Sequence, residues 1–355
     1  MIKIVVFDID GVLTDGRLVV DHAGNEQKHV HIMDIDAVYS LHQDGCLIGV
    51  ITGEDTPIVD YFENRFPWDY FYRGRKDKQA ALEEILADAG LSSDEACYIG
   101  DGRYDAPALR FVGFGACPAD ATEPAKVAAD VILHHDGGDG CIWELVEILK
   151  RRNGDNPAYR YFYDRAYEHT RTFKGMVADY ALMDNMAKIG DAVVALLAEG
   201  RQVFFCGNGG SAADAQHLAT EFVSRFYRER PGMNAEALTV NTSTLTAVGN
   251  DYSFERVFSR QLEAKSHPGD MLFGITTSGR SKNVLEAFRY ASSHGVTCVA
   301  LLGDHVNPEL DELCDYVLKV PSKVTPRIQE AHIFLGHMLA EYVEEKSFGS
   351  SEGKR

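Results

Sequence analysis

Two pairs of acidic side chains each follow an apolar, strand-like segment in the first third of the 355-residue sequence. Asp8 and Asp10 come directly after one such segment, and Asp101 and Asp105 follow another. Carboxylates at the end of a parallel strand lie where α/β folds bind ligands, although any single one could simply form a turn. One carboxylate can attack phosphorus, a second can transfer a proton and a third can bind Mg²⁺. These residue types suit phosphoryl transfer through an aspartyl-phosphate.

A hydroxyl, a glycine and a cation accompany these carboxylates. Thr52 and Gly53 end a third apolar segment, and Lys78 begins a stretch with helical periodicity. Together with the carboxylates, in this order, they resemble the haloacid-dehalogenase phosphatase superfamily over about residues 1–150. The resemblance implies that Thr52, Gly53 and Lys78 bind the phosphoryl group, and Lys78 fits the family spacing better than the nearby Lys76.

The same resemblance implies a role for each carboxylate. Asp8 would be the nucleophile, and Asp10 would be the general acid and base. A Mg²⁺ ion would be held by Asp8, by the Asp10 carbonyl and by Asp101, with Asp105 supporting that shell.

The N-terminal half further resembles the 3-deoxy-D-manno-octulosonate 8-phosphate phosphatase subfamily, through its D-x-D-G-V-L-T-D-G motif, its hairpin and its lack of a cap-sized insertion. Those enzymes are capless tetramers in which a neighbouring subunit helps to close the site. Four positions depart from the subfamily, namely 33–35, Glu54, Gly102 and Asp139. The departures remove cations that an acidic 2-keto sugar needs, so a neutral sugar phosphate is the better candidate substrate.

Two turns rich in glycine and hydroxyl groups mark the second half of the chain. Residues 207–211 (Gly-Asn-Gly-Gly-Ser) and 276–281 (Thr-Thr-Ser-Gly-Arg-Ser) each lie between an apolar strand-like segment and a helix-like one. Backbone N–H groups at a helix N-terminus bind anions, and hydroxyl groups suit a phosphate monoester. The pair of turns resembles a sugar-isomerase (SIS) domain.

Two polar pairs at helical spacing add a candidate metal site. His217 and Glu221 are four residues apart, and Gln329 and His337 are eight apart, so each pair shares one helix face. Their nitrogen and oxygen atoms form a plausible shell for Zn²⁺. His332, three residues after Gln329, is interpreted as a packed residue.

The region Tyr159–Glu345 resembles the bacterial sedoheptulose 7-phosphate isomerase (phosphoheptose isomerase) family. Besides the two polar pairs, the resemblance rests on the motifs Ala213–His217, Val248–Asp251, Phe258–Arg260 and Thr325–Glu330. Moving a proton between C1 and C2 of a sugar through an enediol needs a base and an acid, and Glu221 and His337 are assigned these roles. A carboxylate bound tightly to zinc is a poor base, so whether Glu221 is base, ligand or both stays open. The resemblance implies that the substrate is surrounded by Asn208, Gly209, Ser211, Arg225, Asn250, Asp251, Thr276, Thr277, Ser278, Ser281 and Gln329.

Strand-like and helix-like segments alternate through both halves, which predicts an α/β protein with two doubly wound parallel-sheet domains. We expect a capless haloacid-dehalogenase-like Rossmannoid domain over 1–152, a linker over 153–158, a SIS domain with extra N-terminal helices over 159–346, and a disordered tail over 347–355. Leu18–Val20 and Lys28–Ile32 are predicted to form a hairpin after the first strand.

Composition limits the partners. Subtracting 54 acidic from 35 basic residues gives a net charge of −19, which disfavours nucleic acid and anionic membranes. Apolar runs are too short for a membrane helix, and the first residues are expected to form a strand instead of a signal peptide. Seven scattered cysteines without a C-x-x-C pair indicate reduced thiols in a cytoplasmic protein.

These observations predict a bifunctional enzyme of bacterial heptose or surface-sugar biosynthesis that binds small sugar phosphates. Both resemblances imply active sites completed by neighbouring subunits, so a homotetramer is expected. Two other hypotheses stay open: an arabinose 5-phosphate isomerase joined to an octulosonate 8-phosphate phosphatase, and a non-catalytic SIS protein that senses sugar phosphates or binds a replication initiator.

Overall fold

The computed structural model describes residues 1–154 and 156–349, and the chain divides into two compact units, Met1–Arg171 and Thr172–Arg355. This division lies inside helix α7 (Pro157–Ala178). Helix α6 ends at Asn153, so Pro157 and Ala158 of the predicted linker belong to α7, and Asp155 lies outside the described residues. Each unit is considered by itself below.

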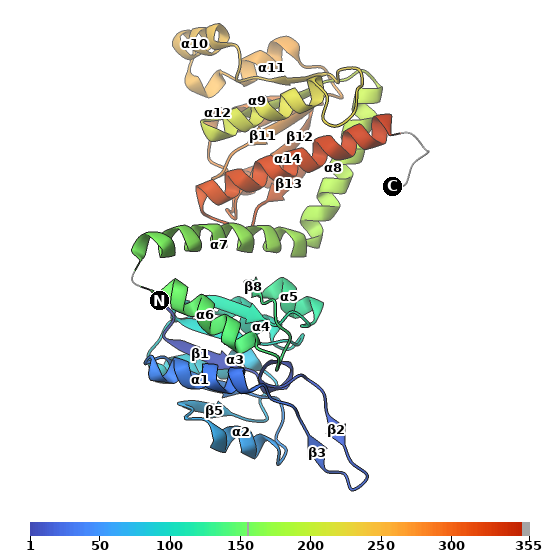
Figure 1. Cartoon of the computed structure of the whole chain (residues 1–355). Coiled ribbons are helices and arrows are strands. Elements are labelled where there is room, and N and C mark those ends of the chain that lie inside the picture. Colours follow the sequence, from blue (N-terminus) through green and yellow to red (C-terminus); the bar gives the residue numbers. More distant parts are fainter. Residues whose placement is uncertain (155, 350–355) are drawn as a thin grey trace. The chain divides into compact units, whose positions relative to one another are not determined.

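The first unit, blue to green in Figure 1, contains a parallel sheet with the strand order β5-β4-β1-β6-β7-β8. Because the chain adds strands on one side of β1 and then on the other, a topological switch point lies between β1 and β6, where such folds bind ligands. The strands are β1 (Ile4–Phe7), β4 (Leu47–Ile51), β5 (Tyr70–Tyr72), β6 (Ala96–Ile99), β7 (Phe114–Cys117) and β8 (Val131–Ile132).

Alternate residues of the central strand face two helical layers. Val5 and Phe7 belong to the apolar cluster that includes α1 and α6, whereas Ile4 and Val6 belong to the cluster that includes α3, α4 and α5. Burial on both faces explains why β1 is a continuous apolar run. The helices are α1 (Ile32–Gln43), α2 (Val59–Arg65), α3 (Lys78–Ala89), α4 (Ala106–Phe111), α5 (Glu123–Ala128) and α6 (Cys141–Asn153).

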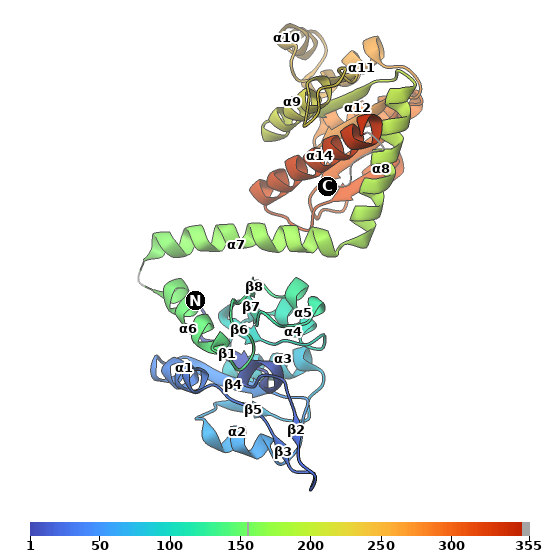
Figure 2. The ribbon, with the colours of Figure 1, turned by 45° about the vertical axis from the view of Figure 1, so that its right-hand side comes forward.

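The predicted hairpin is present but shorter than expected. Its strands are β2 (Val19–Val20) and β3 (Glu26–Gln27), and Ile32, predicted to end the hairpin, begins α1 instead. Figure 2 shows the two short strands extending away from the rest of the first unit. A backbone bridge between Thr14 and Val30 connects the base of the hairpin to the loop after β1.

The second unit contains a parallel sheet with the order β10-β9-β11-β12-β13, which places a switch point between β9 and β11. The sequence run Ala237–Val240 predicts the next strand, but strand β10 lies at Ala235–Ala237, where Ala235 pairs with Val203 at the start of β9. The other strands are β9 (Val203–Gly207), β11 (Met271–Ile275), β12 (Thr297–Leu302) and β13 (Tyr316–Lys319).

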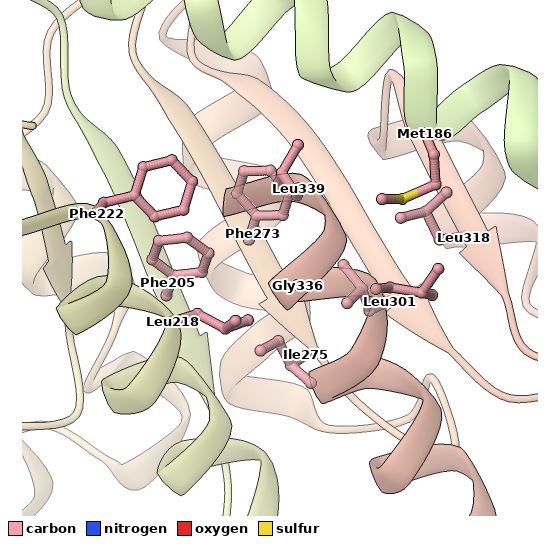
Figure 3. Close-up of a pocket in the computed structure, with 11 residues that line it drawn as sticks. Met186, Phe205, Leu218, Phe222, Phe273, Ile275, Leu301, Leu318, Gly336 and Leu339 are labelled. Carbon is pink, nitrogen blue, oxygen red and sulfur yellow. The ribbon is translucent and has the colours of Figure 1, made fainter. Parts of the chain in front are cut away.

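Helices cover both faces of this second sheet. On one face α8 (Tyr180–Ala198), α9 (Gly210–Val223) and α14 (Thr325–Phe348) enclose an apolar core, part of which Figure 3 shows around Phe205 and Phe273. The other face is covered by α10 (Thr242–Asp251), α11 (Ser259–Lys265), α12 (Lys282–Ser293) and α13 (Pro308–Leu313).

The C-terminal tail differs from the prediction. Helix α14 continues to Phe348, so residues 347 and 348 are helical instead of disordered. Residues 350–355 lie outside the described residues. Within residues 1–154 and 156–349, no helix has both the length and the apolar character needed to cross a bilayer.

Candidate active sites

Three carboxylates converge at the switch point of the first sheet. Asp8 follows β1, and Asp101 and Asp105 follow β6; one oxygen from each lies within 4.8 Å of the others. Asp8 and Asp105 are buried and Asp101 is partly buried. Oxygen-only donors of this kind suit Mg²⁺. Among the described residues this group does not include Asp10, whose carboxylate pairs with Lys28.

Lys78 neutralises part of this acidic cluster. Its Nζ lies 2.7 Å from Asp8 Oδ1 and 3.8 Å from Asp105 Oδ1, and it donates to the Ile51 carbonyl at 2.6 Å. Only 4% of Lys78 is exposed, whereas the rival Lys76 is exposed at the pocket rim. Lys78 is therefore the cation that reaches the candidate nucleophile.

A pocket of about 360 Å³ opens over these side chains. The buried Thr52 lies in its wall with Gly53, and the Thr52 hydroxyl accepts a hydrogen bond from the Glu54 backbone at 3.1 Å. Glu54, Lys76 and Tyr104, which sequence analysis gave no role in binding, also line the pocket.

Burial shifts the ionisation of the carboxylates. Desolvation, with a contribution from neighbouring Asp105, raises the pKa of Asp8 to about 7 against the opposing effect of Lys78. The same two causes raise the pKa of Asp101 to about 6. Asp105 accepts hydrogen bonds from Tyr98 Oη at 2.5 Å and from the Gly102 backbone at 2.8 Å. A divalent cation would relieve this crowding of acidic groups, so the residues present fit Mg²⁺.

Glycines allow the loops around Asp8 to approach one another. Gly11 has a φ of 77°, and a Cβ built on it would lie 2.3 Å from Asp101 Oδ2. A Cβ on Gly137 would lie 2.0 Å from the Gly11 carbonyl. Asp34, which lies between the departing residues Met33 and Ile35, is buried and accepts backbone hydrogen bonds from Gly140 and Ile142, both at 2.9 Å. Asp34 therefore fixes the start of α6.

The turns after β9 and β11 meet at the switch point of the second sheet. Asn208 and Asn283 exchange two amide hydrogen bonds of 2.8 Å, and the hydroxyl groups of Thr276 and Ser281 lie 3.1 Å apart. The pairing with Asn283 was not predicted, because the sequence gives no sign of a role for Asn283 other than its position in the first turn of α12. The two hydrogen bonds connect the two predicted anion-binding turns.

The remaining predicted residues lie in the same two turns, after β9 and after β11. Ser211 is buried in the first turn of α9, and the Ser278 hydroxyl accepts from the Arg280 backbone at 3.3 Å. Gly209 has a φ of 56°, and the backbone carbonyl of Thr277 accepts from the Gly303 N–H at 3.0 Å.

Two histidines and a glutamate converge between α9 and α14. His217 Nε2 lies 2.8 Å from His337 Nε2 and 3.2 Å from Glu221 Oε1. Two ring nitrogens and a carboxylate facing one another fit Zn²⁺. Gln329, the fourth predicted ligand, is on the same helix as His337, two turns before it. It lies against the N-terminus of α9, where a Cβ on Gly210 would be 2.5 Å from its Nε2.

A close approach of two helices brings the histidines together. A Cβ on Gly336 would lie 2.2 Å from Leu218 Cδ2 (Figure 3). Gly336 directly precedes His337 on α14, and Leu218 directly follows His217 on α9. His332, on the same helix, is fully buried, and desolvation lowers its pKa to about 4. It is a core residue, in agreement with its interpretation from the sequence.

Three predicted binding residues make their polar contacts elsewhere. Arg225 is exposed and lies 3.5 Å from Glu229, while the Asn250 amide donates to Asp251 at 2.8 Å at the exposed end of α10. Among the described residues, no hydrogen bond or ion pair connects these three with the two turns or with His217 and His337.

Glu344 fixes the loop that follows Arg225. Its carboxylate accepts hydrogen bonds from the backbone of Phe226, Tyr227 and Arg228 at 2.7–3.0 Å, and from Arg230 Nε at 2.8 Å. Burial raises the pKa of Glu344, but the hydrogen bonds outweigh it and lower the pKa to about 2. Sequence analysis missed this residue, since a glutamate near a helix end has no distinctive spacing.

Comparison with known proteins assigns a family to each half. Residues 168–303 match the SIS domain family, and residues 64–145 match the haloacid dehalogenase-like hydrolase family. A phosphoheptose isomerase from Burkholderia pseudomallei (strain 1710b) is 49% identical over 195 residues, 55% of this chain and 98% of that protein. The solved phosphoheptose isomerase of Francisella tularensis aligns with 54% of this chain and 100% of its own, at 32% identity and a TM-score of 0.50.

A third relative aligns with the first half. It is the solved 3-deoxy-D-manno-octulosonate 8-phosphate phosphatase of Moraxella catarrhalis, in complex with magnesium, phosphate and KDO. It covers 46% of this chain and 92% of its own, at 27% identity and a TM-score of 0.42. With the carboxylate cluster at β1 and β6 and the histidine cluster between α9 and α14, the chain belongs to the phosphoheptose isomerase family and carries that isomerase fused to a haloacid dehalogenase-like phosphatase.

Proposed function

We propose that the second unit converts sedoheptulose 7-phosphate to D-glycero-D-manno-heptose 7-phosphate and that the first unit hydrolyses a sugar phosphate, both in bacterial heptose or surface-sugar synthesis. The observation that carries the isomerase assignment is the convergence of His217, Glu221 and His337 in a chain of which 195 residues align with a phosphoheptose isomerase at 49% identity. A sensor or initiator-binding SIS protein needs the fold but not these three side chains, so their convergence favours catalysis.

In the isomerase, the turns after β9 and β11 bind the phosphate through backbone N–H groups and hydroxyls. Glu221 takes a proton from C1 or C2 and returns it to the other carbon, while His337 exchanges a proton with the sugar oxygens. His217, Glu221 and His337 would hold a Zn²⁺ ion, with Gln329 as a further candidate ligand. When bound, that ion supplies polarisation of the sugar oxygens.

In the phosphatase, Asp8 attacks phosphorus and Lys78 balances the charge that gathers there. Asp10 gives its proton to the departing sugar oxygen, and then accepts one from the water that hydrolyses the aspartyl-phosphate. Thr52 and Gly53 bind the phosphoryl oxygens. Asp8, Asp101 and the Asp10 carbonyl would hold Mg²⁺, which supplies charge neutralisation when bound.

The pocket rim supports a neutral sugar phosphate as the phosphatase substrate. Glu54 lies at this rim and would repel the carboxylate of a 2-keto acid. Asp139 occupies the position of an arginine in the resembled subfamily, and its side chain is 74% exposed. These residues favour a heptose phosphate over an octulosonate phosphate.

A substrate panel tests this assignment. Purified full-length protein is incubated with sedoheptulose 7-phosphate and with arabinose 5-phosphate, and both isomerisation and phosphate release are measured. Phosphate release is also measured with 3-deoxy-D-manno-octulosonate 8-phosphate. We expect isomerisation of the seven-carbon sugar only. Isomerisation of arabinose 5-phosphate together with hydrolysis of the octulosonate ester would support the alternative pair of activities, and neither reaction would support a sensor.

Assembly and location are also proposed. We expect a homotetramer. Arg225 and Asp251 are exposed and, among the described residues, make no hydrogen bond or ion pair with the two turns or the histidines, so a neighbouring subunit can complete the site. A reducing, cytoplasmic location is consistent with the seven scattered cysteines, five of which are buried.

A further inference from the structure

The base of the hairpin places a buried cation next to the candidate general acid. Lys28 follows β3, and its Nζ lies 2.6 Å from Asp10 Oδ1. The Lys28 side chain is only 7% exposed, although that of Asp10 is 35% exposed and lines the pocket. A buried ammonium group is costly without a partner, so the pair constrains both side chains.

The surrounding contacts restrict the Asp10 side chain further. Thr14 Oγ1 also donates to Asp10 Oδ1, at 3.4 Å, and the backbone of Thr14 is bridged to Val30 of the hairpin base. Both polar contacts therefore reach the same oxygen of Asp10. Its other oxygen, Oδ2, is the one that can exchange a proton with a bound ester.

We propose that Lys28 is a positioning residue of the phosphatase, which holds Asp10 by Oδ1 so that Oδ2 faces the leaving group. This inference rests on the proposed phosphatase mechanism. The hairpin then has a part in catalysis besides any part in assembly. The chain enters the hairpin after Asp10 and leaves it at Lys28, the residue that holds Asp10.

The chemistry of the first step distinguishes this role from a structural one. Asp8 forms a bond to phosphorus while the phosphorus–ester oxygen bond breaks, and the electron pair stays on the ester oxygen, which takes the proton of Asp10. A sugar alkoxide is strongly basic and needs that proton, whereas 4-nitrophenolate is weakly basic and departs without it. Misplacing Asp10 therefore slows cleavage of a sugar phosphate much more than cleavage of 4-nitrophenyl phosphate.

The test compares the two esters in the first turnover of full-length protein with Mg²⁺. The sugar ester is sedoheptulose 7-phosphate or 3-deoxy-D-manno-octulosonate 8-phosphate, whichever the wild type hydrolyses faster. For Lys28→Met we expect sugar-phosphate cleavage to fall by about 100-fold, the low end of general acid contributions, and nitrophenolate release to change only a few-fold. Asp10→Asn should show the same selectivity, and Lys28→Arg should recover part of the lost rate.

Gln27→Met is the matched control, because Gln27 is the exposed hairpin residue next to Lys28 and has no contact with Asp10 in the described structure. It should leave both rates unchanged. Equal losses for the two esters in Lys28→Met, or no loss, would overturn the proposal. If Lys28→Met does not fold, Lys28→Gln takes its place in the same comparison, and Lys28→Arg should again recover part of the lost rate. If the wild type hydrolyses neither the sugar phosphates nor 4-nitrophenyl phosphate, the phosphatase assignment itself fails.

Discussion

At the scale of single residues, burial sets the charge of His332. Its ring is fully buried in α14, and desolvation lowers its pKa from 6.5 to about 4. The unfolded chain therefore binds a proton between these pH values that the folded chain does not, so stability decreases as the pH falls through this window. Such a shift corresponds to about 3 kcal/mol below pH 4.

This predicts that His332→Leu reduces the acid sensitivity of the second unit. Urea unfolding followed by circular dichroism at pH 7 and pH 4.5 compares wild type with the variant. The wild type should lose more stability than His332→Leu between the two pH values. An equal loss in both proteins would show that His332 is not the group that titrates.

The polar contacts that arrange the sites were the least predictable part of the sequence. Asp8, Lys78 and Asp101 were found because each follows a strand or begins a helix with a recognisable motif. Lys28 and Asn283 have no such signal; Asn283 is 75 positions from its partner Asn208, and only tertiary packing brings the pair together. For Gln329 the sequence predicts the helix face, whereas its approach to Gly210 at the start of α9 follows only from the packing of α14 against α9.

At the scale of elements, the contact between α9 and α14 positions the histidines. A Cβ on Gly336 would overlap Leu218, which is 2% exposed in the core. Gly336→Ala should therefore push the helices apart, at a cost of about 1–3 kcal/mol, and separate His217 from His337.

The expected result for Gly336→Ala is at least a tenfold loss of isomerase activity with weaker retention of zinc, measured by activity assay and metal analysis. Leu218→Ala provides room for the new methyl group, so the double variant should recover part of both losses. Phosphatase activity serves as the internal control. Full isomerase activity in Gly336→Ala would show that the helix spacing does not matter.

Long apolar strands were predicted more accurately than short elements. The apolar runs Leu47–Ile51, Ala96–Ile99, Phe114–Cys117, Met271–Ile275 and Thr297–Leu302 predict strands, and they coincide with β4, β6, β7, β11 and β12, whose residues are almost all buried. Helices α5, α10, α11 and α13 were missed, because each has few apolar residues at helical spacing. Strand β10 was displaced because its register is fixed by pairing with β9 and not by its own sequence.

At the scale of the whole molecule, exposed apolar groups on the first unit predict self-association. Val19 and Val20 are 47% and 55% exposed on an isolated two-stranded hairpin, and Ile32 at its base is 66% exposed. A hairpin of this kind is marginally stable alone, and contiguous exposed apolar side chains mark contact surfaces.

Light scattering should show a tetramer. The double variant Val19→Asp and Val20→Asp should reduce the measured mass and lower phosphatase activity, because the capless site then loses its cover against water. Gln27→Asp, a polar change on the same hairpin, should keep the mass of the wild type. A fully active monomer would contradict the expected assembly.

The central claim is that the chain contains two independent active sites, and it predicts that each can be removed alone. Asp8 and its partners lie in the unit Met1–Arg171, whereas Glu221 and the histidines lie in Thr172–Arg355. Asp8→Asn removes the anionic nucleophile at almost constant size, and Glu221→Gln removes the base while keeping an oxygen.

The most direct measurement assays both variants, at unchanged oligomer mass, for both reactions. Asp8→Asn should lower phosphate release by several orders of magnitude and leave isomerisation of sedoheptulose 7-phosphate within about twofold of wild type. Glu221→Gln should show the opposite pattern. If folded Asp8→Asn also loses isomerisation, the two reactions share one composite site and the chain does not contain two independent active sites.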